Sequence, residues 1–394
     1  MESKQSLTST NLFFLWFGAS VSVAEILTGG YLADLGFSKG MWAIILGHLV
    51  GTSLLVIAGV IGFRERLPSI MSTRISFGKQ GSYLISIINI LQLVGWTAIM
   101  IIEGGRALNH VTSSLWGFDS IIIHSVTIGI LIGVWVGAGF HGFKILNMAA
   151  VSLLLVLTVI MTVIIFKQPA VTEVKALGFF GTGFELSVIM PLSWFPLIAD
   201  YTSLSNSKKG AWIAPFAGYF IGSCWMYSIG LFGGLFSGSP DPTGMMIAAK
   251  MGFVAFMIIG LSTVTTTFLD VHSATMSLIN IFPNTKRRIA AIVFAAAGTI
   301  LAIYFPVDQY TSFLYLLGSV FSPLISILLT DYFILKVDLR DKAADLPATL
   351  SLITGIIFYY MIKQAQLITG PTLATIIFTF VLHYIFRTVF KTSR

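Results

Sequence analysis

Charged residues are scarce in this 394-residue sequence: they make up 10% of the chain, against roughly 25% in soluble domains. Hydrophobic residues make up 56%, more apolar surface than a water-soluble fold can bury. Cys224 is the single cysteine, which excludes a disulfide framework and a CxxC metal motif. The sequence has no HExxH motif and no His-rich cluster, so we expect neither catalytic residues nor a bound cofactor.

The first nine residues lack the basic start and the cleavage site of a secretory signal peptide, because they are polar and carry only Lys4. We therefore expect the first apolar run to belong to the mature protein. The net charge of +7 could suggest a nucleic-acid partner, but Lys and Arg lie in short connectors between apolar runs. This pattern instead favours a lipid bilayer as the partner and excludes a nucleic-acid-binding face.

Long apolar runs are what the sequence has in abundance. Many reach the roughly 20 residues that a helix needs to cross about 30 Å of hydrocarbon, where the backbone must satisfy its own hydrogen bonds. These runs predict an all-α integral membrane protein with twelve transmembrane helices. The predicted spans are residues 11–35, 41–62, 81–108, 120–140, 145–166, 183–203, 211–237, 247–281, 288–305, 309–335, 347–365 and 371–390.

Basic residues are distributed unequally between the connectors. Twelve spans place both termini on one side, and if that side is the cytoplasm, most Lys and Arg residues lie inside. The positive-inside rule then predicts a multi-pass protein of the cytoplasmic (inner) membrane with both termini cytoplasmic. The basic residues left outside are Lys39, Arg106, Lys167, Lys175, Lys250 and Lys363.

A short motif recurs at an offset of about 170 residues. A Lys-Gly-x-Trp segment opens the second and the seventh span, and a Gly-x-x-x-Gly pair follows each. An offset of five spans inverts the second copy, which predicts a LeuT-type five-plus-five inverted repeat over 11–166 and 183–335, followed by two helices in 347–390. A chance match is the alternative, because Trp and Gly are common in membrane helices. The segments are Lys39–Trp42 with Gly47 and Gly51, and Lys209–Trp212 with Gly218 and Gly222.

Two spans carry candidate breaks at mid-membrane. Residues 18–25 of the first span are dense in small and β-branched residues, and the sixth span contains Pro191 and Pro196. Proline removes an amide donor and clashes with the preceding turn, which disfavours an intact helix. Residues 20 and 21 shifted by 170 land on Met190 and Pro191, so the two breaks are predicted at equivalent positions. The alternative is that these residues only kink and pack ordinary helices.

The third span carries a polar stripe: Asn89, Gln92, Trp96, Glu103 and Arg106 recur at helical spacing. An indole offers a flat heterocycle a stacking surface worth about 1–3 kcal/mol per base in nucleic-acid systems. In the alternative interpretation Trp96 packs against a neighbouring helix, and Glu103 and Arg106 form an ion pair.

The eighth span is rich in hydroxyl groups. Ser262, Thr265, Thr266 and Ser273 fall on one helical face, with Asp270 at its edge. Hydroxyl and carbonyl oxygens suit a small hard cation such as Na⁺. A single threonine often bonds only to the carbonyl one turn earlier, but the cluster favours an ion site.

Three segments together resemble one known family. Gly95-Trp96 precedes a Gly-Gly-x-Ala-Leu run at 104–108, Asp200-Tyr201-Thr202 ends the sixth span, and Ser273-Ala274 precedes Ile281-Phe282-Pro283. The family is that of the nucleobase:cation symporters of the purine/cytosine permease type. The short chain is most similar to its CytX branch, proposed carriers of hydroxymethylpyrimidine.

The resemblance implies import of a pyrimidine-like heterocycle, hydroxymethylpyrimidine or cytosine-like, by Na⁺ or H⁺ symport with alternating access. It also implies that the substrate stacks on Trp96 and that Na⁺ binds between first-span carbonyls and eighth-span hydroxyls. The expected substrate site comprises Ser22, Glu25, Gln92, Trp96, Met100, Ser193, Trp194 and Asp270. The expected ion site comprises Gly18, Ala19, Val21, Ser22, Ser262, Thr265 and Thr266.

Three positions depart from the family pattern. Met100 stands where hydantoin carriers have glutamine, Pro191 where some relatives have an aromatic residue, and Asp270 where many have asparagine. We hypothesise that Asp270 accepts the exocyclic amine of an aminopyrimidine and repels the carbonyl of uracil-like bases. Alternatively, Asp270 pairs with a neighbouring helix or carries a proton, a role that Glu25 or Glu103 could also fill.

Two further functions remain open. An amino-acid or amine carrier of the same fold would use Glu25 or Asp270 to hold an ammonium group. A channel is the other, although an inverted repeat with broken helices favours a carrier.

Overall fold

The computed structural model describes residues 6–137, 140–169, 178–251, 253–304 and 309–389, and helices occupy each of the twelve predicted spans within them. The first span consists of α1 (Ser9–Ser20), α2 (Val23–Tyr31) and the 3-10 turn η1 (Leu32–Leu35), and the sixth consists of α8 (Phe180–Ser193) and α9 (Phe195–Thr202). The other spans are α3 (Gly36–Glu65), α5 (Arg74–Trp116), α6 (Ile121–Gly137), α7 (Phe140–Phe166), α10 (Lys208–Ser237), α12 (Phe253–Ile281), α13 (Arg287–Tyr304), α14 (Tyr310–Leu329) continued by η3 (Thr330–Leu335), α15 (Leu346–Ile362) and α16 (Gly370–Val389).

The prediction for the start of the eighth span is wrong. Residues 242–248 form a separate short helix, α11 (Pro242–Ala248), and α12 begins at Phe253. Lys250 between them has a φ of 57°, a left-handed conformation that a continuous helix does not contain. The apolar run therefore covers two elements.

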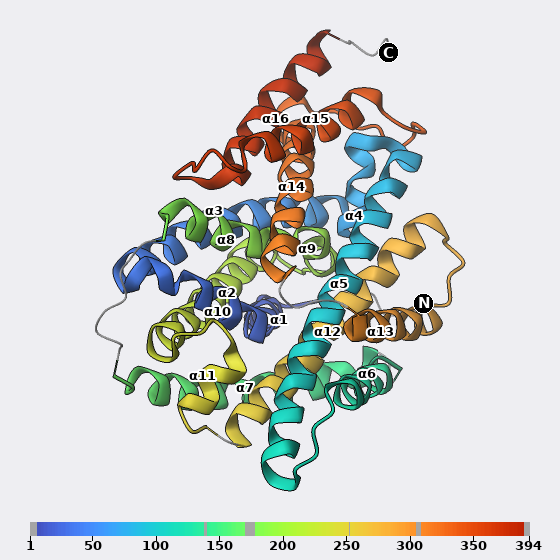
Figure 1. Cartoon of the computed structure of the whole chain (residues 1–394). Coiled ribbons are helices and arrows are strands. Elements are labelled where there is room, and N and C mark those ends of the chain that lie inside the picture. Colours follow the sequence, from blue (N-terminus) through green and yellow to red (C-terminus); the bar gives the residue numbers. More distant parts are fainter. Residues whose placement is uncertain (1–5, 138–139, 170–177, 252, 305–308, 390–394) are drawn as a thin grey trace.

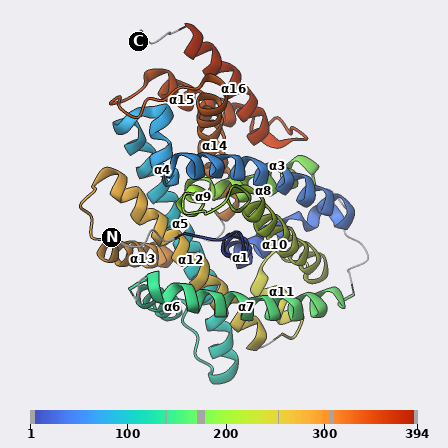
Figure 2. The ribbon, with the colours of Figure 1, turned by 180° about the vertical axis from the view of Figure 1, so that it is seen from behind.

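By length and composition, six helical segments of the described chain could cross a membrane, and the bent pair α8 and α9 makes a seventh. The helices α6 and α15 are apolar but shorter than 18 residues. Figures 1 and 2 agree that α1 and α2 lie near the middle of the molecule, with α15 and α16 at one end and α6, α7 and α11 at the other. The element α5 runs past this centre beside α12.

Glycines allow α3 to pack directly on the backbone of α8. A Cβ atom at Gly47 would lie 2.8 Å from the carbonyl oxygen of Phe184, and one at Gly51 would lie 2.6 Å from that of Val188. Both distances are shorter than ordinary van der Waals contact, so only glycine fits at this crossing.

The same crossing recurs between α10 and α1. A Cβ atom at Gly218 would collide with the carbonyl oxygen of Phe13, and one at Gly222 would lie 3.3 Å from that of Phe17. Both contact residues on α8 follow their counterparts on α1 by 171 residues, the offset that also separates the glycines. This equivalence supports the inverted repeat, whose boundaries at 11–166 and 183–335 remain a prediction.

Candidate transport site

The first break in a helix lies at Val21 and Ser22, one residue beyond the predicted position. Val21 has φ −80° and ψ 76°, and Ser22 is extended, so neither is helical. The Ser22 hydroxyl accepts a hydrogen bond from the Ala24 amide at 3.2 Å and caps the N-terminus of α2. A serine cap therefore starts the second half of this span.

The break redirects backbone amides away from two carbonyls. The Ser22 amide donates to Ser20 O at 2.9 Å, whereas an unbroken helix would direct it to Gly18 O. The Glu25 amide donates to Ser22 O at 3.2 Å instead of Val21 O. The carbonyl oxygens of Gly18 and Val21 thus lose their helical donors.

A third carbonyl is released by a contact with α12. The Val23 amide donates to Ser262 Oγ at 3.1 Å, so the oxygen of Ala19 also loses its helical donor. Thr265 donates back to two carbonyls of its own helix at 2.9 and 3.1 Å. The Thr266 hydroxyl is buried and has no hydrogen-bond partner in the described chain. Free carbonyl and hydroxyl oxygens, the ligands that hard cations prefer, therefore gather at this break.

Ser22, which was predicted for both the ion site and the substrate site, lies in the pocket wall. Its carbonyl accepts amides of α2, including that of Glu25, and its hydroxyl lies 3.2 Å from the Ala24 amide and 3.8 Å from Met100 Sδ. Its place in the ion site stays a prediction.

The second break lies at Trp194, whereas the prediction placed it at Met190 and Pro191. Helix α8 continues through Pro191 to Ser193, because a proline removes only its own amide donor from the ladder. The axes of α8 and α9 differ by 40°. The Trp194 amide still donates to Pro191 O at 3.2 Å, so this break is a kink with its backbone largely paired.

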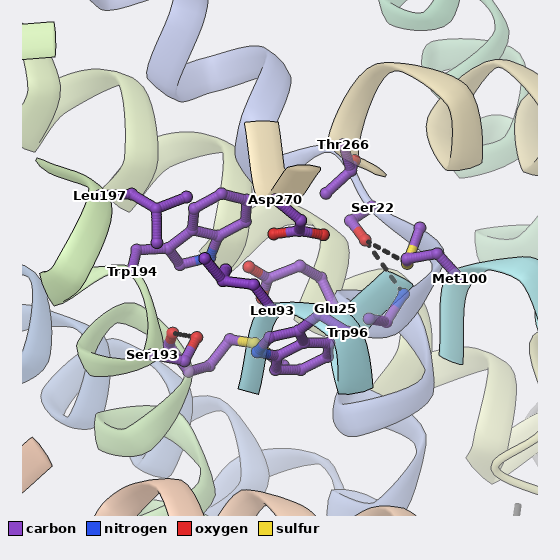
Figure 3. Close-up of a pocket in the computed structure, with 12 residues that line it drawn as sticks. Ser22, Glu25, Leu93, Trp96, Met100, Ser193, Trp194, Leu197, Thr266 and Asp270 are labelled. Carbon is purple, nitrogen blue, oxygen red and sulfur yellow. Dashed lines mark hydrogen bonds between the residues drawn. The ribbon is translucent and has the colours of Figure 1, made fainter. Parts of the chain in front are cut away.

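A pocket lies between the two breaks, bounded on its other side by α5 and α12 (Figure 3). All predicted substrate residues except Gln92 line it: Ser22, Glu25, Trp96, Met100, Ser193, Trp194 and Asp270. Four apolar residues in the lining were not predicted, because an apolar side chain beside a polar stripe looks like ordinary packing. They are Ala24, Leu93, Met190 and Leu197. Thr266, which was predicted for the ion site, also lines the pocket.

Two indoles form walls of the pocket. Trp96 packs its ring edge-on against Phe313 at 5.4 Å and Tyr310 at 6.1 Å between centroids. Trp194 packs edge-on against Trp16 at 5.9 Å. Both indoles are held by neighbouring rings, so they offer a ligand a fixed aromatic surface.

Two carboxyl groups point toward the space between the indoles (Figure 3). Glu25 is fully engaged by α10, because Tyr219 donates to Oε1 at 2.7 Å and Ser223 lies 2.6 Å from Oε2. Asp270 is equally buried, but its Oδ2 has no hydrogen-bond partner within the described residues. Asp270 therefore keeps an acceptor for a ligand, whereas Glu25 is held by the protein.

Gln92 and Glu103 of the α5 stripe lie outside the pocket lining. Gln92 donates to Asn89 Oδ1 at 2.9 Å and lies 3.5 Å from Ser193 O, so it supports the wall from one turn away. Glu103 lies 3.7 Å from the Arg106 guanidinium, the ion pair expected in the alternative interpretation. Neither side chain lines the pocket.

The residues that hold Glu25 were missed in the sequence. Ser223 Oγ also lies 2.6 Å from His48 Nε2 on α3, and His48 is completely buried. A lone histidine in an apolar span was the available signal, because ionisable groups at membrane depth are costly. Tyr219 and Ser223 gave no comparable signal, since both are ordinary residues of membrane helices.

Comparison with known sequences places the chain among permeases. Residues 1–347 match the sequence pattern of a family described as permease for cytosine/purines, uracil, thiamine, allantoin. The cytosine permease of Escherichia coli (strain K12) is 24% identical over 329 residues, which cover 82% of this chain and 77% of that permease.

Solved transporters share the fold. Mhp1, a nucleobase-cation-symport-1 family transporter in a closed conformation with bromovinylhydantoin bound, superposes with a TM-score of 0.82 at 19% identity, covering 99% of this chain and 95% of Mhp1. A Na⁺-coupled sialic acid symporter superposes with a TM-score of 0.62 at 12% identity, covering 97% of each chain. These matches confirm the predicted LeuT-type, multi-pass helical transporter fold.

Proposed function

The chain belongs to the family of permeases for cytosine and purines, uracil, thiamine and allantoin, and from this premise we propose that it imports an aminopyrimidine, either hydroxymethylpyrimidine or a cytosine-like base, together with a cation. Membership makes it a membrane permease rather than an enzyme. We also propose that it belongs to the CytX branch of this family.

The free acceptor of Asp270 carries the choice of substrate. The lining contains two carboxyl groups and no Lys, Arg or His side chain. An aminopyrimidine stacked on Trp96 can donate its exocyclic amine to Asp270 Oδ2, the buried oxygen without a partner. A uracil-like base presents a carbonyl at the same edge, which would repel the carboxylate. The pocket therefore favours amino over oxo pyrimidines.

Competition in proteoliposomes tests this selectivity. Hydroxymethylpyrimidine, cytosine and uracil compete for uptake by wild type and by Asp270→Asn, and the wild type should prefer the two amino compounds. The asparagine side chain can also donate a hydrogen bond to the carbonyl of uracil, so the preference of Asp270→Asn for the amino compounds should be smaller. Asp119→Asn, on an exposed connector, is the matched control and should keep the wild-type ratio. An unchanged ratio in Asp270→Asn with a lower rate would refute recognition by Asp270.

We place the cation between the carbonyls of Gly18, Ala19 and Val21 and the hydroxyls of α12. A hydroxyl that donates to its own helix, as Thr265 does, still offers a lone pair to a cation. Thr266→Val removes one oxygen without changing side-chain shape, so it should raise the Na⁺ concentration needed for half-maximal uptake. An unaltered Na⁺ dependence in both Thr265→Val and Thr266→Val would refute this site.

An amine carrier of the same fold is the second candidate, and the two carboxyl groups of the lining favour it over an amino-acid carrier. No basic side chain of the lining could hold a substrate carboxylate. This candidate would be selected if a simple aliphatic amine inhibited uptake of labelled substrate at concentrations where cytosine has no effect.

The distribution of basic residues leads us to propose that both termini face the cytoplasm. Tags placed at each terminus should resist labelling from outside the cell and react after permeabilisation. Labelling of either tag in intact cells would reverse this orientation.

A further inference from the structure

A chain of three buried side chains leads from the pocket to α3. Glu25 Oε2 lies 2.6 Å from Ser223 Oγ, and Ser223 Oγ lies 2.6 Å from His48 Nε2. At the far end His48 Nδ1 lies 2.9 Å from the carbonyl oxygen of Ile44. All three side chains are at most 1% exposed, and among them only Glu25 lines the pocket. We refer to Glu25, Ser223 and His48 as the proton chain.

The distances fix how many protons the proton chain holds. A carbonyl has no hydrogen, so His48 Nδ1 must donate to Ile44 O, and Nε2 of a neutral imidazole is then an acceptor. Ser223 has one hydrogen but lies between two acceptors, Nε2 and Glu25 Oε2, when the carboxyl group is ionised. One of the two short contacts would then join lone pairs. A single added proton turns both contacts into hydrogen bonds.

The added proton can reside at either end. On Glu25, the carboxylic acid donates to Ser223 and Ser223 donates to His48. If the Glu25 hydrogen moves to Ser223 Oγ while the Ser223 hydrogen moves to Nε2, the result is a carboxylate and an imidazolium. Every hydrogen bond is kept in both arrangements, and the number of protons is unchanged. Ser223 thus connects two proton acceptors with no net loss of a proton, because it receives one hydrogen as it gives one up.

No Lys or Arg side chain forms a salt bridge with Glu25 in the described residues. The other titratable groups around the proton chain are Tyr219, Tyr227 and Cys224 on α10, Tyr310 on α14 and Asp270 across the pocket. The salt bridges of the described residues include neither Glu25 nor His48. An ionised Glu25 would be a buried, uncompensated charge, which is costly at membrane depth. A proton supplies the compensation that Lys or Arg would otherwise provide.

We infer that the proton chain is a proton-binding site and that one proton crosses the membrane with each substrate molecule, in addition to the cation at the first break. The inference rests on the proposed transport function, because Glu25 is part of the pocket wall. Whichever side the pocket opens to is the side from which Glu25 exchanges its proton. Substrate and proton therefore bind and leave on the same side, which is the requirement for symport.

Substrate-driven proton movement tests the inference. Proteoliposomes containing a pH-sensitive dye and equal Na⁺ on both sides receive an inward gradient of hydroxymethylpyrimidine or cytosine, and the wild type should acidify the lumen. Ser223→Ala separates the two ends, and His48→Gln cannot accept a proton, so both should lose acidification. Ser223→Thr restores the hydroxyl and should recover it. Glu103→Gln, a buried glutamate outside the proton chain, should acidify like the wild type.

Counterflow of labelled substrate, which needs binding and both pocket orientations but no net proton movement, separates two kinds of failure. Counterflow that persists in Ser223→Ala and His48→Gln while acidification is lost supports the proton chain. Acidification that persists in both variants, or is absent from a wild type with normal counterflow, overturns it. Absence of counterflow from the wild type with either pyrimidine would refute the proposed transport function instead.

Discussion

The two broken spans are related by the repeat, yet they interrupt the helix by different means. The break between α1 and α2 contains no proline, takes two residues out of helical conformation and releases three carbonyls. The break between α8 and α9 lies between two prolines and only bends the chain at Trp194. Proline content is thus a poor guide to how far a membrane helix opens. A serine cap and a hydroxyl from a neighbouring helix stabilise the wider break, because they satisfy the amides that it exposes.

This difference has a functional counterpart. The open first break gathers oxygens suited to a cation, and the kinked second break supplies an aromatic wall through Trp194. A backbone must be unpaired to bind an ion, but it only needs a change of direction to present a side chain. The two halves of one repeat can therefore diverge in chemistry while keeping the same crossing.

The largest effects should come from filling the glycine crossings, which the two halves share. Gly47→Val and Gly218→Val each place side-chain atoms against the backbone of the crossing helix. Overpacking of this kind typically costs about 1–3 kcal/mol and more where neither backbone can move, so little folded protein should remain. Gly133→Val on α6, where no atom lies within 4 Å, is the control. Monodisperse yield and thermal unfolding in detergent measure the effect, and loss in only one half would break the equivalence.

Substrate affinity should respond next, through the indoles of the two halves. Trp96→Ala and Trp194→Ala should each weaken binding by about 1–3 kcal/mol if a base stacks on both walls. Trp96→Phe should retain part of the affinity, and Trp116→Ala, 75% exposed, should retain all of it. Calorimetric titration with cytosine compares the four. Equal losses in Trp96→Phe and Trp96→Ala would indicate that Trp96 only packs the core.

A smaller difference should separate the serines at the two breaks. Ser22→Ala removes the N-cap of α2 and should cost about 1 kcal/mol of stability. Ser193→Ala removes a hydroxyl that donates to Met190 O in its own helix, at 2.7 Å, so it should cost less. Thermal unfolding of both variants in the same detergent gives the comparison. Equal costs would mean that the first break does not depend on its cap.

The smallest effect is expected from the prolines themselves. Pro196→Ala should leave the bend at Trp194 in place, because the turn is closed by backbone hydrogen bonds on both sides of it. The expected cost is about 0.5 kcal/mol, which arises from greater freedom of the unfolded chain. A cost as large as that of Ser22→Ala would show that Pro196 holds the bend.

The sequence predicts the helical class and the twelve spans because the bilayer requires long apolar runs whatever their neighbours are. It also predicts most polar residues of the lining, since Glu25 and Asp270 are ionisable groups at membrane depth and Trp96 lies on a polar stripe. The exact position of the second break could not be predicted, because it depends on how Trp194 packs rather than on Pro191. The partners of Glu25 come from α10, and one of them, Ser223, contacts His48 on α3, so only the tertiary arrangement brings these residues together.

The glycine crossings also determine which parts of the molecule can slide. Where backbones touch without intervening side chains, as between α3 and α8 and between α10 and α1, no side chains can change rotamer to let one helix slide along the other. Those four helices should therefore move together as one rigid unit. Across the pocket, this unit and α2, which continues the span of α1, meet α5 and α12 through single hydrogen bonds such as that from Val23 on α2 to Ser262 on α12, which can be exchanged one at a time. The protein thus has rigid helix contacts at the glycine crossings beside contacts that can rearrange, and the pocket lies at the contacts that can rearrange.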